Sequence, residues 1–350
     1  MIMATTPDIR SFTLADLQKL FVEIGQPAYR AQQVYDWMWK LGAKNFDDMS
    51  NAPASLRKHL SDHYSFNSIT EDVRQQSTDG TIKTRFKLHD GNKIESVLIP
   101  VKIDKRYTAC ISSQVGCSLT CSFCATGQMG RVRNLTAAEI YDQAFETNRM
   151  CVQITGSPLT NIVYMGMGEP LLNYGPVMQS IEKITGSDGM GMSPRRVTVS
   201  TAGIAKMIRK LADDDVKFNL ALSLHAADDV KRSRIMPIND TNHLETLMEA
   251  LEYFYMKTHG RISYEYIALR GFNDGLDDAD KLVKLCRRKF PVRVNIIEYN
   301  PVPGAEFEKA NEQQIDAFAK RIRDKGVMIT VRRSRGKDID AACGQLANQE

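Results

Sequence analysis

The sequence of 350 residues lacks several features that define broad classes of protein. It contains no run of about 18 apolar residues, so we expect no membrane-spanning helix and no membrane partner. Residues 1–7 hold neither a basic stretch nor an apolar one, so we expect no secretion signal and a cytoplasmic location. The formal net charge is only +4, which neither requires nor excludes a nucleic acid partner.

Cysteine is scarce, and its placement is uneven. The chain has seven cysteines, and three of them, Cys117, Cys121 and Cys124, stand at C-x3-C-x2-C spacing with Phe123 before the last. No fourth cysteine follows closely, whereas a complete iron–sulfur cubane usually takes four thiolates and a closed zinc site takes four ligands. The spacing therefore predicts a [4Fe–4S] cluster with one iron left open for another ligand.

Other uses of these three cysteines fit less well. A zinc knuckle needs a nearby partner such as histidine, and none occurs between Ala125 and His225. A disulfide cluster is not expected without a secretion signal. Three unrelated buried cysteines at this spacing would be a coincidence in a chain that has only seven.

The spacing and the aromatic residue resemble the signature of radical S-adenosylmethionine (SAM) enzymes. In that class, the amino acid end of SAM binds the open iron. Reduction then splits the sulfonium and gives a 5′-deoxyadenosyl radical. An oxygen-sensitive cluster of this kind is consistent with the expected cytoplasmic location.

From residue 107 onward, strand-like segments alternate with amphipathic helical segments. The strand patterns cover residues 107–113, 161–165, 196–200, 218–224, 262–269, 293–297 and 327–332. This alternation predicts an α/β fold built from about six parallel βαβ units, which together form a partial, open TIM-like barrel. Chemistry in such barrels lies on the loops after the strands, and the three cysteines directly follow the first strand.

Two smaller regions precede the barrel. Residues 1–65 predict short amphipathic helices with basic and aromatic residues interleaved, which indicates either an RNA-binding accessory domain or a small bundle with solvated charges. Residues 66–106 predict a β-hairpin linker, with strands over 83–88 and 93–100. We expect the barrel to occupy residues 107–350 and to end in a tail that carries Cys343.

Small polar, glycine and acidic residues follow several of the predicted barrel strands. These residues are Gly168, Glu169, Ser200, Ser223, Leu224, His225 and Asn300. Glycine lets a ligand approach the backbone closely, and an acidic residue beside it can bind the amino group of SAM. Each residue alone could serve a turn or a helix cap, but together they predict a cradle for SAM.

Two of the remaining cysteines, Cys110 and Cys343, have positions that would allow them to act at the predicted site. Cys343 follows two alanines and precedes a glycine, so it has room and mobility. Cys110 lies seven residues before Cys117, near the expected mouth of the barrel, where the two could meet. Cys151 and Cys286 fall in helical patterns, and we expect them to be packing residues.

Seven motifs along the chain are distinctive in combination. They cover residues 110–117, 123–127, 133–136, 165–170, 223–225, 236–239 and 341–346. Together they resemble the RlmN/Cfr family, whose members are radical SAM methyltransferases that act on an adenine of 23S ribosomal RNA. The resemblance extends over nearly the whole chain, and it favours the RNA-docking interpretation of residues 1–65.

The resemblance implies a reaction that uses two SAM molecules per turnover. Cys343 takes a methyl group from one SAM, and a radical made from the second removes hydrogen from that methyl group. The resulting carbon radical adds to the adenine and links the RNA to Cys343. Cys110 then attacks the sulfur of Cys343 and releases the product, while Glu95 is offered as the acceptor of the ring proton.

The resemblance also implies partners and a choice of target atom. Expected partners are 23S rRNA, tRNA next to the anticodon and a reductant such as flavodoxin, and we expect a monomer. One branch of the family methylates adenine C2 and the other methylates C8. The segments 94–100 and 114–117 resemble the C2 branch, whereas Glu298 departs from it and leaves the choice open. Candidate contacts to phosphate are Arg131, Arg133, Arg195 and Arg196.

Two other classes of function compete with a C2 or C8 methyltransferase. A radical SAM enzyme that activates a protein by making a glycyl radical would give Cys343 and the N-terminal helices no role. A non-enzymatic iron–sulfur electron carrier would use four cysteine ligands. Neither such a carrier nor an iron–sulfur RNA-binding sensor needs a SAM cradle.

Overall fold

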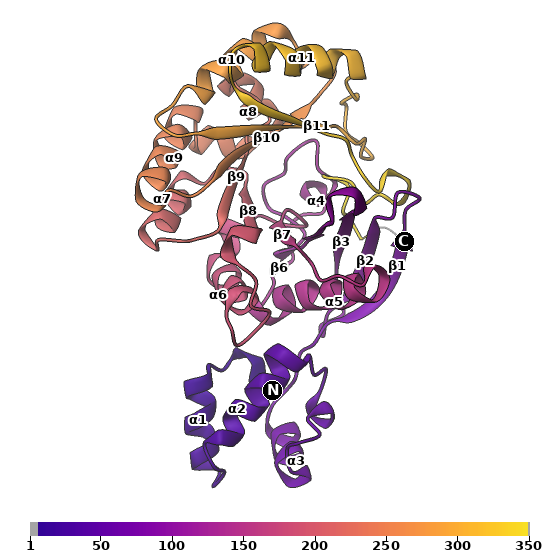
Figure 1. Ribbon diagram of the computed structural model, residues 1–350, viewed down its shortest axis with the longest axis vertical. Helices are drawn as coiled ribbons and strands as arrows, with labels where there is room; N and C mark the ends of the chain where they lie inside the picture. The colour runs from indigo at the N-terminus through magenta and orange to yellow at the C-terminus, as the bar shows by residue number, and fades with distance from the viewer. Residues whose placement is uncertain (1–5, 349–350) are drawn as a thin grey trace.

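The molecule is built on one open, ten-stranded sheet in the order β1-β2-β3-β4-β7-β8-β9-β10-β11-β12 (Figure 1). The computed structural model describes residues 6–348. The strands of this sheet are β1 (Thr70–Gln76), β2 (Ile82–Lys87), β3 (Lys93–Val101), β4 (Arg106–Cys110), β7 (Asn161–Tyr164), β8 (Val197–Thr201), β9 (Asn219–Ser223), β10 (Ile262–Ala268), β11 (Val292–Glu298) and β12 (Met328–Arg332). Strands β5 (Gln114–Val115) and β6 (Arg133–Asn134) form a separate small sheet.

Strands β4 and β7 to β12 pair in parallel, as the alternating pattern predicts. The helices of the chain are α1 (Leu14–Glu23), α2 (Tyr29–Asp36), α3 (Ala54–His63), α4 (Ala125–Gln128), α5 (Ala137–Thr155), α6 (Tyr174–Thr185), α7 (Ala205–Asp213), α8 (Asp229–Ile235), α9 (Leu244–Thr258), α10 (Leu276–Cys286) and α11 (Glu312–Asp324). Helices α5, α6, α7, α9, α10 and α11 lie on the outer side of the curved sheet (Figure 1). Strand β10 is buried at six of its seven residues, which is typical of a parallel strand covered on both faces.

The strands before the barrel differ from the predicted linker. The expected hairpin is present as β2 and β3, but β3 also pairs antiparallel with β4, through Val97 opposite Cys110. The hairpin therefore extends the barrel sheet and is not a separate element. Strand β1 was not predicted, because all seven of its residues are exposed and it shows no apolar alternation.

The N-terminal helices pack against the barrel below α5 (Figure 1). Arg10 is buried and donates two hydrogen bonds of 2.7 Å to the carboxylate of Asp142 on α5. The Arg10 guanidinium also lies 4.8 Å from the centre of the Trp39 ring. Helix α1 is capped by Thr13, where Thr13 and Asp16 form a capping box.

The basic residues of the N-terminal helices do not form a continuous positive patch. Four of them lie within ion-pair distance of nearby acidic side chains: Lys40 of Asp36, Lys44 of Glu146, Arg57 of Asp47 and Lys58 of Asp62. Most of the charge that suggested RNA binding here is therefore balanced locally. Within residues 6–348, no helix has both the length and the apolar content needed to cross a membrane.

After β12, the last strand of the sheet, the chain crosses to the other end of the sheet, where β1 and β2 lie. Residues 333–348, called the arm below, reach the turn between β1 and β2, where the Ser77 hydroxyl donates a hydrogen bond of 2.5 Å to Asp338. Figure 1 shows the arm in yellow as it crosses to the first strands of the sheet. The arm therefore spans the gap between the two ends of the open sheet, and it carries Cys343 at its middle.

Candidate active site

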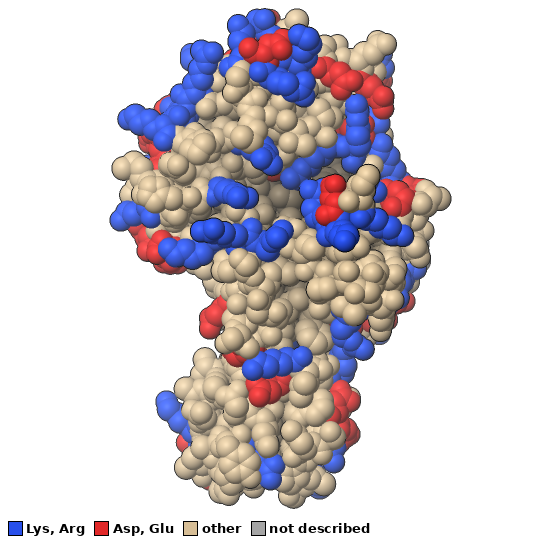
Figure 2. Space-filling view, in the orientation of Figure 1, with Lys and Arg blue, Asp and Glu red and all other residues tan. Residues whose placement is uncertain are grey.

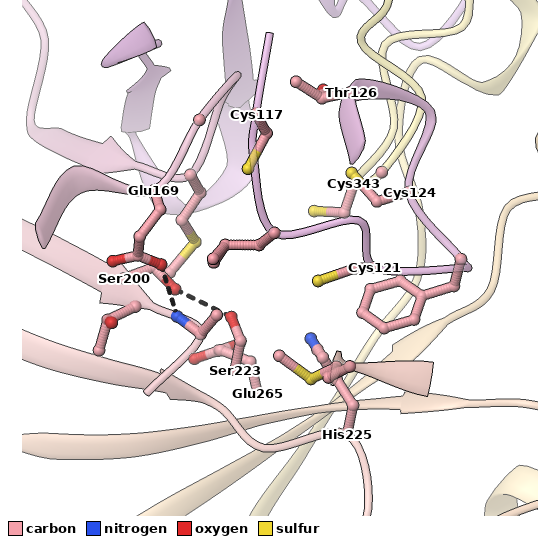
Figure 3. A pocket seen from close by; sticks show the side chains of 18 of the residues that line it. Cys117, Cys121, Cys124, Thr126, Glu169, Ser200, Ser223, His225, Glu265 and Cys343 are labelled. Atoms are coloured by element: carbon pink, nitrogen blue, oxygen red, sulfur yellow. Dashed lines mark hydrogen bonds between the residues drawn. The ribbon is translucent and has the colours of Figure 1, made fainter. Parts of the chain in front are cut away.

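A pocket lies at the carboxyl ends of the barrel strands, where a barrel fold predicts the chemistry. Nine of the predicted site residues line it: Cys117, Cys121, Cys124, Gly168, Glu169, Ser200, Ser223, His225 and Cys343. Figure 3 shows the thiols of the three spaced cysteines and of Cys343 around one space. Four predicted residues, Leu224, Asn300, Cys110 and Glu95, are not among the described residues that line this pocket.

The three spaced cysteines lie on the loop after β4, as predicted. In residues 6–348, no three sulfur, imidazole or carboxylate groups are close enough together to hold a single metal ion. A four-iron cluster binds each thiolate through a different iron, so three thiolates on one loop would leave the fourth iron open. Burial raises the pKa of Cys117 to about 11, so this thiol needs a metal or cluster to ionise it near pH 7.

Backbone contacts hold the cysteine loop in place from two sides. Ser122 N–H donates to the carbonyl of Ile235 at the end of α8 (3.1 Å), and Ala125 N–H donates to the carbonyl of Gly344 on the arm (2.7 Å). A Cβ at Gly127 would lie 3.0 Å from the backbone of Cys121, so the helix after the loop packs tightly against it. The loop geometry therefore depends on segments that lie more than 100 residues further along the chain.

Gly168 and Glu169 form the part of the cradle that follows β7. Gly168 has φ of +96°, and a Cβ there would lie 2.5 Å from the side chain of Gln114, so only glycine fits. The carboxylate of Glu169 accepts hydrogen bonds from the N–H groups of Ala202 (2.7 Å) and Leu171 (3.0 Å). Glu169 lines the pocket, where its carboxylate can meet a cationic ligand such as the SAM ammonium.

The pKa of Glu169 gives a pH-dependent prediction. Burial raises this pKa to about 7, against the hydrogen bonds from Ala202 and Leu171. Between about pH 4.5 and 7 the folded protein keeps a proton that the unfolded chain has lost, so the free energy of unfolding should fall as pH rises. The loss should reach up to about 3 kcal/mol without SAM, since one pKa unit is worth about 1.4 kcal/mol.

Denaturant unfolding of the SAM-free protein from pH 5 to 8 measures this effect. The variant Glu169→Gln has no titrating group at this position, so its stability should vary less over the same range. Equal pH dependence in the parent and the variant would show that Glu169 titrates normally.

Ser200, Ser223 and His225 line the pocket from the ends of β8 and β9. The hydroxyls of Ser200 and Ser223 lie 3.3 Å apart. His225 adopts the left-handed region (φ +56°), and its Nδ1 accepts a hydrogen bond of 3.1 Å from the N–H of Ile267. Burial and the nearby Arg232 lower the pKa of His225 to about 3, so the ring is neutral and carries its proton on Nε2.

Arg232 is a supporting residue that the sequence analysis missed. Its side chain is completely buried and donates hydrogen bonds to the carbonyls of Leu224, Ala202 and Ser223 and to the side chain of Asn239. It therefore ties the loops after β8 and β9 together beneath the pocket. The only sequence signal was its place four residues before the 236–239 motif, and its acceptors are mostly backbone groups that no sequence pattern reveals.

Glu265 is a second residue that the sequence analysis missed. It lies on β10, is 2% exposed and lines the pocket. Its carboxylate accepts from Asn295 and Ser263, both at 2.8 Å, and lies 3.4 Å from Arg332. The sequence signal for Glu265 was its position inside a predicted strand, between Tyr264 and Tyr266. An acidic residue in such a buried segment usually has a binding partner, which marks it as a candidate site residue.

Cys343 lines the pocket, and Cys110 is not among the described residues that line it. Cys343 is exposed to solvent within the pocket, although the surrounding protein raises the pKa of its thiol. Cys110 is buried, which raises its pKa far above the ordinary value, and the neighbouring Cys343 adds to this effect. Both thiols are free.

Glu95 and Arg133 occupy different surroundings from those expected. Glu95, offered as the acceptor of the ring proton, is 1% exposed, and its carboxylate binds the arm. Arg133 was a candidate phosphate contact, but it donates to both oxygens of Glu139 (2.8 and 2.7 Å) and to Asp90. Arg133 therefore supports the start of α5, whereas Arg131, Arg195 and Arg196 are exposed.

The open barrel and the C-x3-C-x2-C loop at its mouth define a radical SAM enzyme. The Radical SAM superfamily matches residues 111–286, and the Ribosomal RNA large subunit methyltransferase N-terminal domain matches residues 8–65. A crystal structure of a radical SAM methyltransferase from Sphaerobacter thermophilus superposes with a TM-score of 0.92 and 39% identity, over 98% of this chain and 100% of that one.

Two curated relatives extend the match over almost the whole chain. The probable dual-specificity RNA methyltransferase RlmN of Christiangramia forsetii is 52% identical over 342 residues, which are 98% of this chain and 96% of the relative. The protein of the same name from Flavobacterium johnsoniae is 51% identical over 343 residues, with 98% and 97% covered. The chain belongs to the RlmN family of radical SAM RNA methyltransferases.

Proposed function

We propose that the enzyme methylates C2 of an adenine in 23S rRNA and in tRNA next to the anticodon, through a methyl group carried on Cys343. The observation that carries this proposal is the position of Cys343 in the same pocket as Cys117, Cys121 and Cys124. A packing cysteine would not lie exposed beside a radical-generating loop. The names of the relatives support an RNA substrate with two classes of target.

Three cysteines and the cradle fit the cofactors of this family. Cys117, Cys121 and Cys124 would hold a [4Fe–4S] cluster, and Glu169 with Ser200 and Ser223 would hold SAM. When bound, these groups supply an activated methyl group and a carbon-centred radical. The protein must then place Cys343 next to both the SAM and the RNA base.

The residues have distinct tasks in this reaction. Adenine C2 is electron-poor and does not attack a methyl group itself, so Cys343 serves as the nucleophile that receives the methyl. After the carbon has joined the base, the adduct loses one electron and the ring proton, and Glu95 accepts this proton. Cys110 then attacks the sulfur of Cys343, which breaks the bond between that sulfur and the new carbon, and the carbon takes up a proton to become the methyl group. The resulting disulfide needs an external thiol to restore the two cysteines.

The pocket lies inside the barrel, so the target base must leave its stack to reach it. Figure 2 shows Lys and Arg side chains gathered around the hollow in the barrel face, where an RNA backbone would approach. Exposed Arg131, Arg195 and Arg196 are available for phosphates. We further propose a cytoplasmic monomer that receives electrons from a reductant such as flavodoxin.

Glu298 does not favour the C8 alternative. This residue departs from the C2 branch in sequence, but it is not among the described residues that line the pocket. Its carboxylate instead binds Arg333 and Lys337 of the arm. The departure therefore falls on a residue that binds the arm.

The decisive experiment is methylation in vitro. The cluster is reconstituted without oxygen, SAM and a reductant are added, and fragments of 23S rRNA and a tRNA are offered in parallel. Mass spectrometry of the nucleosides should detect 2-methyladenine in both RNAs. Methylation only at C8, or none, would contradict the proposed reaction, and methylation of rRNA alone would remove tRNA from it.

The variant Cys110→Ala should trap the RNA on the protein. Without Cys110, nothing attacks the sulfur of Cys343, so a protein–RNA adduct should accumulate and migrate as a shifted band on a denaturing gel. The matched control is Cys151→Ala, because Cys151 is also buried and free but lies on α5. If Cys110→Ala turns over normally and gives no adduct, Cys110 is not the resolving cysteine.

A further inference from the structure

The arm is held at both ends by buried carboxylates. Glu298 and Glu95 are each 1% exposed, and both point their carboxylate oxygens at the arm. Cys343 lies between the two contact points. The two carboxylates bind different kinds of group on the arm, charged side chains at one end and backbone N–H groups at the other. This difference indicates that the two carboxylates have different roles.

Glu298 holds the base of the arm through charged side chains. Its carboxylate accepts from Arg333 (2.9 Å), from Lys337 (2.8 Å) and from the backbone N–H of Ser334 (3.2 Å). Burial opposes ionisation, but these contacts outweigh it and hold the pKa of Glu298 at about 2. Ser334 also lies only two residues beyond β12, so this end of the arm is fixed to the sheet.

Glu95 holds the far end of the arm through backbone groups only. One carboxylate oxygen accepts from the N–H groups of Ala347 (3.0 Å) and Asn348 (3.2 Å). The other oxygen lies 3.4 Å from the ammonium of Lys83 on β2. Because Lys83 does not belong to the arm, Glu95 keeps a counter-ion when the arm leaves, and release does not strand a buried charge.

The middle of the arm rests on the segment after the cysteine loop. The Thr126 hydroxyl donates to the carbonyl of Leu346 (2.6 Å), in addition to the bond between Ala125 and Gly344. Gly344 has φ of +86°, a conformation that glycine adopts without strain. With both ends held, these contacts fix Cys343 at the pocket.

We propose that Glu298 is the permanent anchor of the arm and that Glu95 is its releasable latch, so that both are positioning residues for Cys343. With the latch closed, Cys343 faces the pocket. With the latch open, residues 341–348 move while the base of the arm stays anchored at Glu298. Cys343 can then leave its position in the pocket and contact other groups. The role of this movement in methylation rests on the proposed function, whereas the movement itself can be tested without methylation.

The latch also constrains when Glu95 can act as a proton acceptor. Its oxygen that binds Ala347 and Asn348 is occupied while the arm is closed. Opening the arm frees this oxygen. Proton removal from the base and release of Cys343 would therefore occur in the same open state.

Hydrogen exchange of the cluster-free, reduced full-length protein tests the proposal without any methylation. In Glu95→Ala, the amides of residues 345–348 should exchange at least about tenfold faster, because local opening no longer breaks the two bonds to Glu95. The amides of residues 333–338 should keep their parental rates. In Glu298→Gln, both segments should exchange faster, because the anchor carries the whole arm.

Two further variants keep the test decisive if Glu298→Gln does not fold. The double variant Arg333→Ala with Lys337→Ala removes the same contacts from the side of the arm, where both side chains are partly exposed, and should give the same result. Glu139→Gln is the control, because Glu139 is equally buried and ion-paired but touches no part of the arm. It should lower the melting temperature and leave the exchange pattern of the arm unchanged.

Glu95→Gln separates the latch from the proton acceptor. Glutamine keeps one oxygen that accepts from the arm, so exchange of residues 345–348 should stay close to the parental rate. Glutamine cannot accept the ring proton, so methylation should fail in the reconstituted enzyme. Unchanged exchange in Glu95→Ala, or equal acceleration at both ends of the arm, would overturn the proposed latch even if methylation proceeds as described.

Discussion

The variant Cys343→Ser should lose more than about 10⁴-fold of its methylation activity, the scale of loss when a covalent nucleophile is removed. A hydroxyl at this position is too poor a nucleophile to take the methyl group from SAM. The cysteines of the loop do not replace it, because they would be bound to the cluster. Quantified 2-methyladenine per enzyme, under single-turnover conditions, measures the loss.

The same preparation must show that the rest of the site survives. Iron content and the visible absorbance of the cluster should equal those of the parent, because Cys117, Cys121 and Cys124 are untouched. Cys286→Ser is a suitable control, since Cys286 is a free cysteine at the end of α10 and does not line the pocket. A Cys343→Ser enzyme that retains more than about a tenth of the activity would exclude Cys343 as the methyl carrier.

The parts of the site that could be predicted from the sequence are those with local patterns. The spacing of Cys117, Cys121 and Cys124 lies within eight residues, and the strand ends at Ser200 and Ser223 follow from the alternation of strands and helices. Parallel strands end at one mouth, so residues far apart in the chain were expected to lie near one another, and nine of them line one pocket. Helix α5 begins at a signal of the same local kind, a capping box formed by Thr136 and Glu139.

The parts that could not be predicted depend on contacts between distant segments. Glu95 binds amides more than 250 residues away, and Arg232 binds backbone carbonyls that carry no side-chain signal. A sequence pattern reports which face of an element is apolar, but it does not say which loop reaches a buried carboxylate. For the same reason Leu224 and Asn300 were assigned to the cradle by their place after a strand, although neither lines the pocket.

The second large effect concerns the junction between the N-terminal helices and the barrel. Replacing Arg10 with Met should lower the free energy of unfolding by about 3–5 kcal/mol, the usual cost of removing one partner of a buried ion pair. Asp142 would keep one hydrogen bond, a weak one of 3.3 Å from the N–H of Ile69, and would lose its cation. The contact of the guanidinium with Trp39 would be lost as well.

Fluorescence during denaturation is a direct measurement of this effect. Both tryptophans of the chain, Trp37 and Trp39, lie in the N-terminal region, and Arg10 covers Trp39. The tryptophan signal should change at a lower denaturant concentration in Arg10→Met than in the parent. Lys58→Ala removes an exposed ion pair with Asp62 in the same region and should shift the free energy by less than about 1 kcal/mol.

The double variant Arg10→Met with Asp142→Leu decides the physical cause. If the loss comes from an uncompensated buried carboxylate, removing that carboxylate should restore most of the stability, because apolar side chains of similar size fill the site. If the double variant stays as unstable as Arg10→Met, the loss comes from the packing of Arg10 on Trp39 and Phe66 instead. Under either result, an enzyme whose N-terminal helices detach should keep its cluster, since the pocket lies wholly within the barrel and the arm.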